Sequence, residues 1–473
     1  MIYENLDTES HKIKIIRRDS LIISKHHSEL CNIIKKNLTR RFNNYHNNKG
    51  EINQFFNEDE TNLYVPVLYP IEDLIDCDII DERIDGCDIE IQCNAIPRNK
   101  LQEETLDYLL NNNEGIIQLD TGSGKTIIAI MAISKIKKKT LILLHRTNLA
   151  HQWIERFREF TDIGDNISIL ENSKIKESFS KSIVIATVQS FMMALKNRKD
   201  EFILELEKAN FGLLFSDELH VTSGAKKFSE CSLYIPVKRR FGLSATPKRY
   251  DGTSDILIYH LGKIYKPDGE SGIMKAKVNI IFFNFGLTKS FKYVYWGGKF
   301  ERSRYLNLLK KSDKLNKICL ELLYKSRDRN IFIIIERVKF VEQLFKSFEC
   351  DDKATYFKTD KNDNLKSRVV FATPGKVRDG IDAPEKDSLI MTSPIGNITQ
   401  ICGRILRTSL NKKKPVIFDL VDIGYKDIFK TVYKRIQFYK SKEWEINYFK
   451  IEDKIEKIDD IYSFLKEIES NKK

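Results

Sequence analysis

The stretch Asp120-Thr121-Gly122-Ser123-Gly124-Lys125-Thr126 combines residue types that bind phosphate groups. It follows a short apolar run, residues 115–119, and precedes an apolar segment of helical character that begins at Ile127. Glycines let backbone N–H groups approach phosphate oxygens closely, and the helix adds the positive end of its dipole. In such a loop Lys125 reaches the β- and γ-phosphates, and Thr126 binds Mg²⁺. The stretch therefore predicts a site for a nucleoside triphosphate, ATP, with Mg²⁺.

This loop departs from the full phosphate-binding pattern at Leu119, where a glycine is usual. A chance match is the alternative interpretation, and the strand–loop–helix context disfavours it. We assign six residues of the loop to the nucleotide site: Thr121, Gly122, Ser123, Gly124, Lys125 and Thr126.

A pair of adjacent carboxylates, Asp217 and Glu218, follows another apolar run, residues 213–216. Asp217 can hold Mg²⁺, and Glu218 can orient and deprotonate the attacking water in hydrolysis. An isolated pair of this kind is usually a surface feature. Its position after a buried strand and downstream of the phosphate-binding loop favours a catalytic role.

A third candidate group lies much later in the chain, in the segment Gln400–Arg407. If the segment is helical, Gln400, Arg404 and Arg407 share one face at positions i, i+4 and i+7. Guanidinium groups stabilise charge on a transferring phosphoryl group. Taken alone the segment would be an amphipathic basic helix, but together with the other two motifs it is interpreted as catalytic.

The elements that must position these residues are short apolar runs that alternate with helical segments. Runs of this kind indicate parallel strands buried on both faces, with crossover helices between them. Ligands bind such sheets beyond the carboxyl ends of the strands, where the candidate residues fall. The first set of runs is 115–119, 140–144, 182–186 and 211–215, and the second is 330–335, 368–372, 388–391 and 415–419.

The fold class expected is therefore α/β, with two RecA-like parallel-sheet domains in tandem and a small N-terminal accessory domain. A chain of 473 residues is too long for one compact core. We expect four segments: an accessory region at 1–95, an ATP-binding domain at 96–265, a second α/β domain at 266–430 and a helical tail at 431–473.

The net charge of +12 and the pI near 9.0 favour polyanionic partners, because basic side chains that neutralise phosphates release counterions. A generic lysine-rich surface is the alternative. No run approaches the roughly 20 apolar residues that span a bilayer, and the first residues lack an apolar core, so we expect an intracellular protein without a membrane partner. Cys77, Cys87 and Cys93 cluster without the spacing of a zinc module and are interpreted as reduced thiols.

Together these motifs resemble those of superfamily 2 helicases of the DExH type, over about residues 97–450. Further segments that match follow in the family's order: 145–153, 187–190, 242–247, 249–252, and 379–384 preceded by Ala372-Thr373. The continuation at 249–252 is typical of phage UvsW-like, XPB-like and type III restriction translocase members. Size and composition are similar to helicases of large cytoplasmic DNA viruses, including the poxvirus transcript-release helicase, and a phage or linear-plasmid origin fits as well.

The resemblance implies roles for residues in these segments. Residues implied to contact the nucleotide are Arg98, Gln102, Gly380 and Asp382. Residues implied to couple hydrolysis to strand movement are His220, Ser244, Ala245 and Thr246. Residues implied to contact the nucleic-acid backbone are Arg146, Thr187, Gln189 and Thr373.

The function implied is an ATP hydrolase that moves along nucleic acid or unwinds it, with DNA favoured over RNA. Transcription or replication machinery is the expected partner, and the host cytoplasm or a virion is the expected location if the protein is viral. One alternative is a translocase that releases transcripts or displaces proteins without separating strands, and another is an RNA helicase. A nucleic-acid-binding scaffold with a nonhydrolytic nucleotide site belongs to a different class.

Overall fold

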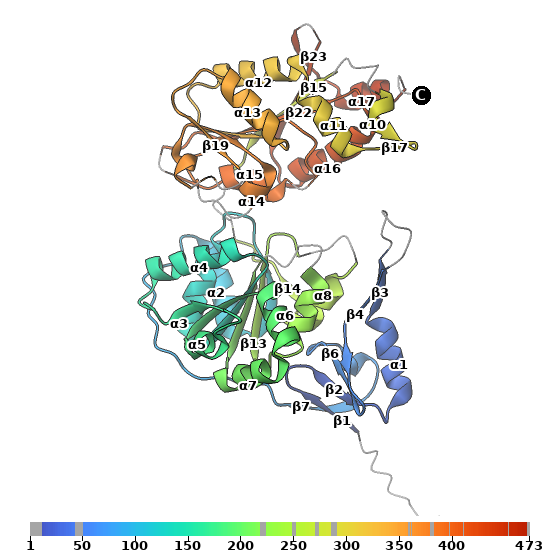
Figure 1. Cartoon of the computed structure of the whole chain (residues 1–473), viewed down its shortest axis with the longest axis vertical. Helices are drawn as coiled ribbons and strands as arrows, with labels where there is room; N and C mark the ends of the chain where they lie inside the picture. Colours follow the sequence, from blue (N-terminus) through green and yellow to red (C-terminus); the bar gives the residue numbers. More distant parts are fainter. Residues whose placement is uncertain are drawn as a thin grey trace, which may run out of the picture. The chain divides into compact units, whose positions relative to one another are not determined.

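The computed structural model describes residues 12–42, 51–217, 224–247, 252–269, 274–284, 291–357, 360, 362–378, 383–396, 398–409, 411–452 and 454–470. The chain divides into two compact units, Met1–Asp120 with Gly124–Ser271, and Gly272–Lys473 with Thr121–Ser123. Figure 1 shows the first unit in blue to green and the second in yellow to red.

The N-terminal region forms a small domain around a five-stranded sheet of order β5-β6-β2-β1-β7. Its apolar core includes Ile256 of a later helix, α9 (Ser254–Leu261), and the rings of Tyr69 and Tyr259 meet edge to face at 5.2 Å. The Leu68 N–H donates to the carbonyl oxygen of Tyr259 at 2.8 Å. The small domain is thus packed against the rest of the first unit. Its elements are β1 Ile13–Arg17, β2 Leu21–Ser24, α1 Ser28–Asn37, β3 Thr39–Phe42, β4 Glu51–Gln54, β5 Asn57–Glu58, β6 Asn62–Val65, η1 Ile71–Asp73 and β7 Cys77–Asp81.

A seven-stranded parallel sheet of order β10-β11-β9-β12-β13-β8-β14 follows in the first unit. Its strands are β8 Glu114–Gln118, β9 Thr140–Leu144, β10 Ile167–Ile169, β11 Ile183–Thr187, β12 Leu213–Asp217, β13 Arg239–Ser244 and β14 Ile264–Tyr265. Its helices are α2 Lys100–Asn111, α3 Lys125–Ile136, α4 Thr147–Phe160, α5 Ile175–Ser180, α6 Val188–Asn197, α7 Lys199–Ala209, α8 Gly224–Ser232 and α9.

This sheet is buried on both faces, which explains why its strands have continuous apolar sequences. In β9, Ile142 and Leu144 belong to a core cluster with residues of α2, α3 and α4. Leu141 and Leu143 of the same strand belong to the opposite cluster, with residues of α5 to α9. Alternate side chains of a strand point to opposite faces, so a strand covered on both sides carries no polar alternation.

The second unit contains an eight-stranded sheet of order β19-β20-β18-β21-β22-β15-β23-β24, parallel except for the antiparallel pair β23–β24. Its strands are β15 Lys277–Phe283, β18 Ile331–Ile334, β19 Lys353–Tyr356, β20 Val369–Ala372, β21 Ser388–Met391, β22 Val416–Asp422, β23 Glu445–Ile451 and β24 Ile455–Lys457. A separate hairpin pairs β16 Tyr295–Trp296 with β17 Lys299–Phe300. The helices are α10 Phe291–Val294, α11 Arg302–Leu309, α12 Asp313–Lys325, α13 Val338–Ser347, η3 Asn362–Lys366, α14 Pro374–Arg378, α15 Thr399–Ile405, α16 Lys426–Ser441 and α17 Ile461–Ser470.

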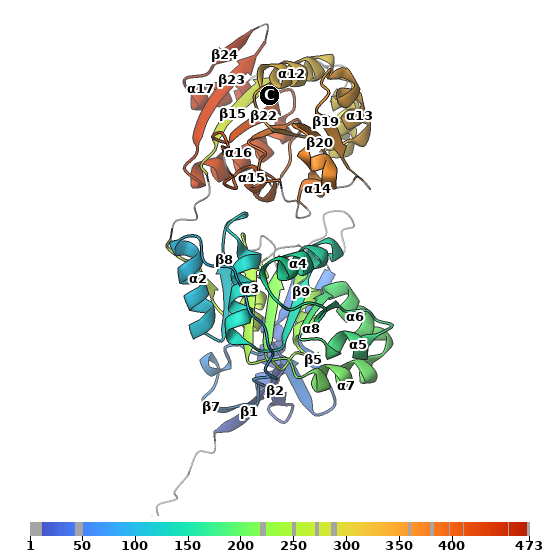
Figure 2. The ribbon, with the colours of Figure 1, turned by 90° about the vertical axis from the view of Figure 1, so that its left-hand side faces the viewer.

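These two parallel sheets and the small N-terminal sheet confirm the predicted fold class. The prediction of a helical tail over 431–473 is wrong for residues 445–451, which form β23 along the whole length of β15 (Figure 2). Glu445-Ile446-Asn447-Tyr448-Phe449-Lys450-Ile451 is rich in aromatic and β-branched residues. Such residues favour a strand once a neighbouring strand offers hydrogen bonds, and the partner residues in β15 lie 168 positions earlier in sequence.

Candidate nucleotide site and nucleic-acid interface

The parallel register of the first sheet brings the predicted site residues to one edge. Gln118, at the end of β8, pairs with Ser244 of β13, and Asp217, at the end of β12, pairs with Leu243. The N–H of Leu119, the first residue after β8, donates to the Ser244 carbonyl oxygen at 3.1 Å. Neighbouring strands of the first sheet therefore place three features at the same edge: the phosphate-binding loop, the Asp217 carboxylate and the segment Ser244-Ala245-Thr246.

In the phosphate-binding loop, α3 begins at Lys125 and its N-cap is Gly124, with a φ of +90°. The Lys125 ammonium donates to the carbonyl oxygens of Leu119 at 3.1 Å and of Asp120 at 3.3 Å. The lysine thus lies over its own loop. Thr126 is the second residue of α3, at the positive end of the helix dipole. The Lys125 ammonium and the N-terminus of α3 are groups that can bind the phosphates of a nucleotide that arrives with Mg²⁺.

The amide of Gln102 lies beside this loop. Gly124 has a positive φ, which favours glycine, and a Cβ atom there would stand 2.6 Å from Gln102 Nε2, so a larger residue would displace the Gln102 amide. Gln102 is buried near the start of α2; its N–H donates to the Asn99 side-chain oxygen at 3.0 Å, and its Oε1 accepts from the Arg98 N–H at 2.9 Å. The fold thus brings residues 98–102 to the nucleotide loop, while the Arg98 side chain is exposed.

A buried hydrogen bond holds Asp217. Trp153 Nε1 of α4 donates to Asp217 Oδ2 at 3.2 Å, and Trp153 is only 1% exposed. A buried indole N–H usually has a hydrogen-bond acceptor. The need of Trp153 for an acceptor was therefore the one signal in the sequence that pointed to a partner such as Asp217. The sequence grouped Trp153 with the nucleic-acid contact segment and missed this interaction, because the two residues are 64 positions apart.

Arg146 and Gln189 lie in two helical N-termini that leave adjacent strands. Leu144, which ends β9, pairs with Thr187, which ends β11. Arg146 is the N-cap residue of α4 and is exposed, and Gln189 is exposed in the first turn of α6. Helix N-termini attract phosphate groups. The structure therefore places these two predicted contact residues just beyond the ends of neighbouring strands, at the edge where Asp217 also lies.

Thr187 has a structural task that the sequence did not predict. Its hydroxyl caps α6 by accepting from the Ser190 N–H at 3.0 Å, and Ser190 Oγ accepts from the Thr187 N–H at 3.1 Å. This capping box fixes the first turn of α6 and so orients Gln189. Of the coupling residues, Ser244 also has a local role, because its hydroxyl accepts from the Thr246 N–H at 3.2 Å.

In the second unit, Thr373 comes directly after β20 and before α14. A hollow of about 460 Å³ opens at this point; Thr373, Pro374 and Gly375 line it on one side, and Arg302 and Gly396 are among its other lining residues. Thr373 is thus at the carboxyl edge of the second sheet and faces a concave surface.

The prediction that Gln400, Arg404 and Arg407 share one helix face is wrong for Arg407. Helix α15 ends at Ile405, so Arg407 lies in the segment beyond it. Arg404 is buried, and its Nε donates to the carbonyl oxygen of Val377 in α14 at 3.2 Å.

Four predicted site residues lie outside the described part of the chain: Glu218, His220, Gly380 and Asp382. Among the described residues, no group of three or more His, Cys, Asp or Glu side chains is arranged to hold a metal ion. A magnesium ion that arrives on a nucleotide needs only one or two protein oxygens, because phosphates and water complete its shell. Thr126 and Asp217 fit that requirement.

Comparison with known proteins agrees with this arrangement. Residues 92–249 match the family described as "Type III restriction enzyme, res subunit". "Putative ATP-dependent RNA helicase L396" of Acanthamoeba polyphaga mimivirus is 25% identical, over 72% of this chain and 66% of the relative. "Putative helicase 161L" of Invertebrate iridescent virus 6 is 26% identical over 74% and 81%. The XPB helicase/translocase subunit of Encephalitozoon cuniculi is 27% identical over 69% and 52%.

Two solved structures share the fold. One is the type ISP restriction-modification enzyme LlaBIII bound to DNA, with a TM-score of 0.53 and 15% identity over 78% of this chain and 32% of that chain. The other is Dbp5 of S. cerevisiae bound to RNA and ADP BeF3, with a TM-score of 0.50 and 16% identity over 79% and 94%. T4 UvsW aligns with 93% of this chain and 99% of its own at 18% identity, with a TM-score of 0.38.

The fold and the residues at its edges define a protein with two RecA-like domains and a phosphate-binding loop. In fold and in the order of its motifs the chain is similar to superfamily 2 helicases, as its motifs predicted. It spans about two thirds of the mimivirus relative and about half of the XPB relative. None of the helices in the described residues combines the length and the apolar character that crossing a membrane requires.

Proposed function

We propose that this chain hydrolyses ATP with Mg²⁺ and uses the reaction to move along nucleic acid, with DNA as the track. The observation that carries the proposal is the parallel register of the first sheet. It aligns Gln118, Ser244, Asp217 and Thr187 at one edge, so that groups for a nucleotide and groups for a phosphate backbone occupy neighbouring strands.

The nucleotide chemistry is assigned as follows. Lys125 leaves the carbonyls of Leu119 and Asp120 and binds the β- and γ-phosphates. Thr126 and Asp217 hold the Mg²⁺, which neutralises charge on the phosphates. Glu218 orients and deprotonates the attacking water. The backbone N–H groups of Thr121, Gly122, Ser123 and Gly124 bind phosphate oxygens.

We propose roles for the remaining predicted site residues in the same way. Gln102, fixed beside Gly124, positions the adenine, together with Arg98. Gly380 and Asp382 add nucleotide contacts. Gln400, Arg404 and Arg407 stabilise charge on the transferring phosphoryl group. His220, Ser244, Ala245 and Thr246 couple hydrolysis to movement.

Nucleic acid is proposed to run along the carboxyl edges of the sheets. Arg146 and Gln189, at two neighbouring helix N-termini, hold phosphates without reading sequence, as does Thr373 in the second unit. Thr187 contributes by fixing the first turn of α6. Binding of this type weakens steeply with salt, because it depends on released counterions.

The deciding experiment is ATPase measured in parallel without nucleic acid and with single-stranded DNA, duplex DNA, forked DNA and RNA. Lys125→Ala and Glu218→Gln should each lower the rate by about 10² or more, as expected for loss of one essential group. Lys174→Ala, an exposed lysine paired with Glu177, is the matched control and should keep the wild-type rate. Hydrolysis that survives Glu218→Gln would contradict the assignment, and no hydrolysis by the wild type would leave only the scaffold alternative.

A second candidate is movement without strand separation. XPB is described as a helicase/translocase subunit of a transcription and DNA repair factor, which supports transcription machinery as a partner here. The mimivirus relative is described as an RNA helicase, which keeps RNA as an alternative track. Unwinding of a tailed duplex, measured beside displacement of a stalled polymerase, separates the candidates. A viral or mobile-element origin and an intracellular location stay predictions.

A further inference from the structure

The β16–β17 hairpin carries the most exposed tryptophan of the described residues. Gly297 and Gly298 link the two strands with φ values of +55° and +75°, the positive pair that a tight two-residue turn requires. Tyr295 pairs with Phe300 and Trp296 pairs with Lys299. Residues directly opposite each other across a hairpin point to the same face. One face therefore presents Tyr295 and Phe300, and the other presents Trp296 and Lys299.

The face that carries Tyr295 and Phe300 packs against other residues of the second unit. Phe300 lies 5.7 Å from Tyr295, 5.6 Å from Tyr305 and 6.2 Å from Tyr425, measured between ring centroids. The Tyr295 hydroxyl donates to Asp427 of α16 at 2.9 Å. These aromatic contacts and this hydrogen bond hold the base of the hairpin, so the second face is presented on a rigid support.

The second face combines aromatic rings with cations. Trp296 is 66% exposed, although burial of an indole is favourable. The Arg304 guanidinium lies 4.6 Å from the Trp296 ring centroid and 5.5 Å from that of Tyr293, which is also exposed. The Arg304 guanidinium also donates a hydrogen bond to the carbonyl oxygen of Tyr293, at 3.3 Å. We call Tyr293, Trp296 and Arg304 the aromatic platform.

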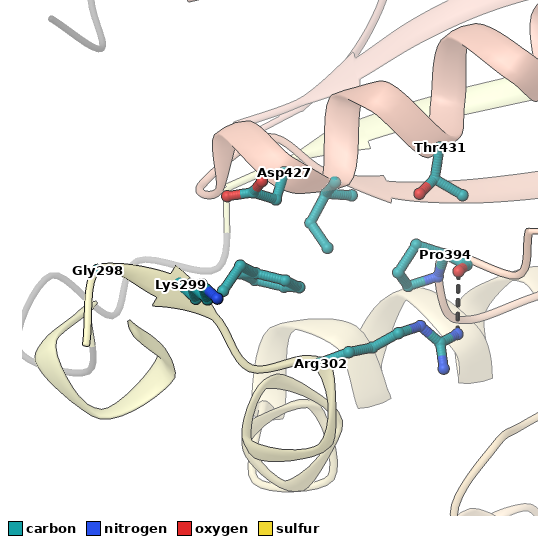
Figure 3. Close-up of a pocket in the computed structure, with 8 residues that line it drawn as sticks. Gly298, Lys299, Arg302, Pro394, Asp427 and Thr431 are labelled. Atoms are coloured by element: carbon teal, nitrogen blue, oxygen red, sulfur yellow. Dashed lines mark hydrogen bonds between the residues drawn. The ribbon is translucent and has the colours of Figure 1, made fainter. Parts of the chain in front are cut away.

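A hollow of about 500 Å³ lies against β17, and its lining includes Lys299, the residue that pairs with Trp296. Figure 3 shows Lys299 and Arg302 on one side of it, with Asp427 and Thr431 of α16 on the other. Arg302 is fixed by a hydrogen bond to the Pro394 carbonyl oxygen at 3.0 Å and by an ion pair with Glu336. The hollow therefore offers two cations, Lys299 and Arg302, and the Thr431 hydroxyl, together with the Asp427 carboxylate that accepts from Tyr295.

Arg302 connects this hollow to the surface assigned above to nucleic acid. It lines the hollow of the hairpin and also the second hollow, which contains Thr373. A strand whose phosphates pass Thr373 thus meets Arg302 next, and then Lys299 and the platform. Continuity with that assigned surface favours a nucleic-acid strand over a protein segment as the occupant.

We propose that the β16–β17 hairpin is a stacking site for an unpaired base of the nucleic-acid strand, with Trp296 as the stacking ring. Lys299 and Arg302 bind the neighbouring phosphates in the hollow. The proposal rests on the proposed function, because it extends the same track. Aromatic rings beside a basic groove bind single strands without sequence preference, and each stacked base contributes substantially to affinity. A duplex keeps its bases stacked internally and should gain little from the platform.

Tryptophan fluorescence of the full-length protein, titrated with oligo(dT) and with a blunt duplex, tests the proposal. The chain has three tryptophans, and the other two, Trp153 and Trp444, are buried. Oligo(dT) should quench the emission of Trp296, and Trp296→Phe should lose that quenching while keeping most of the affinity. Trp296→Ala should weaken single-strand binding about 5- to 150-fold and duplex binding much less.

Tyr462→Ala is the matched control, because Tyr462 is 64% exposed and has the Lys440 ammonium 5.1 Å from its ring centroid. It should leave both affinities at wild-type values. Equal loss of single-strand and duplex binding in Trp296→Ala, or unchanged quenching in Trp296→Phe, would overturn the stacking site. In either case the proposed motor function stands if the wild type hydrolyses ATP on addition of DNA. A wild type that binds no nucleic acid would overturn both proposals.

A second measurement keeps the test independent of how the variants fold. An oligonucleotide with 5-bromodeoxyuridine at each position, irradiated with the wild-type protein, should crosslink to the peptide that contains residues 293–304. Crosslinks confined to other peptides would overturn the stacking site without any substitution.

Discussion

Trp153→Phe should weaken the binding of Mg²⁺ to the ATP-loaded protein while leaving the fold intact. The variant removes one interaction, the hydrogen bond from Trp153 Nε1 to Asp217 Oδ2 at 3.2 Å, and keeps an aromatic ring at the same place. A hydrogen bond to a charged group contributes about 1.5–3 kcal/mol. That range corresponds to a factor of about 10 to 150 in an equilibrium constant. Residues that orient a metal-binding carboxylate typically change metal affinity about 10- to 100-fold, which agrees.

The assay is the Mg²⁺ dependence of ATP hydrolysis at saturating ATP. A second readout, free of turnover, is the Mg²⁺-dependent rise in melting temperature with a nonhydrolysable ATP analogue. Both midpoints should move to about 10- to 100-fold higher Mg²⁺ in Trp153→Phe, with the maximal rate restored at high Mg²⁺. The cause is a carboxylate with more orientational freedom, so the defect is one of affinity.

Phe157→Leu is the control for the small cavity that Trp153→Phe leaves. Phe157 is buried on the same helix, 6.1 Å from the Trp153 ring centroid, and cannot donate to Asp217. It should lower the melting temperature without moving either Mg²⁺ midpoint. If both variants move the Mg²⁺ midpoints equally, Trp153 contributes only by packing, and its hydrogen bond does not orient Asp217 for Mg²⁺.

Three further predictions concern other parts of the molecule. Gln102→Ala should raise the KM for ATP and reduce the preference for ATP over GTP, because the amide beside Gly124 is lost; unchanged nucleotide selectivity would refute it. Burial and the nearby Arg240 charge lower the pKa of His260 well below its usual value. The unfolded chain then binds a proton near pH 6.5 that the native state excludes, so stability falls below that pH by up to about 1.4 kcal/mol per unit, and His260→Gln should remove this slope in urea unfolding. Lys299→Gln should reduce the slope of log affinity against log salt for oligo(dT) by about 0.7, whereas an unchanged slope would exclude a phosphate contact.

The fold, and the position of most candidate nucleotide residues at the edge of the first sheet, were predictable because their signals are local in sequence. A strand buried on both faces must be apolar along its whole length, and a loop that approaches phosphates must carry glycines. Lys125 follows such a strand and Asp217 ends one, so the local sequence around each residue indicated its position at the edge of the sheet. Gln102 was less direct, since its place beside Gly124 depends on the start of α2 packing against another element.

What the sequence did not predict depends on contacts between distant segments. The Trp153–Asp217 hydrogen bond joins residues 64 positions apart, and β23 becomes a strand only because β15 is available to pair with it. The hairpin was missed for a different reason. Two strands of two residues each carry no periodicity, and only Gly297-Gly298 signalled a tight turn.

Arg435 and Tyr439, near the C-terminal end of the segment that resembles the helicases, form a buried polar network in the second unit. Arg435 of α16 is buried; it forms an ion pair with the equally buried Asp419 at 3.1 Å and donates to the Ser393 carbonyl oxygen at 3.2 Å. Tyr439, one helical turn further, donates to the other Asp419 oxygen at 2.9 Å. Ser393 lies in the segment that leads from β21 into α15, the helix that carries Gln400 and Arg404. Removing one partner would leave a buried charge uncompensated, which is strongly destabilising, and loss of Arg435 would also remove the hydrogen bond to the Ser393 carbonyl oxygen.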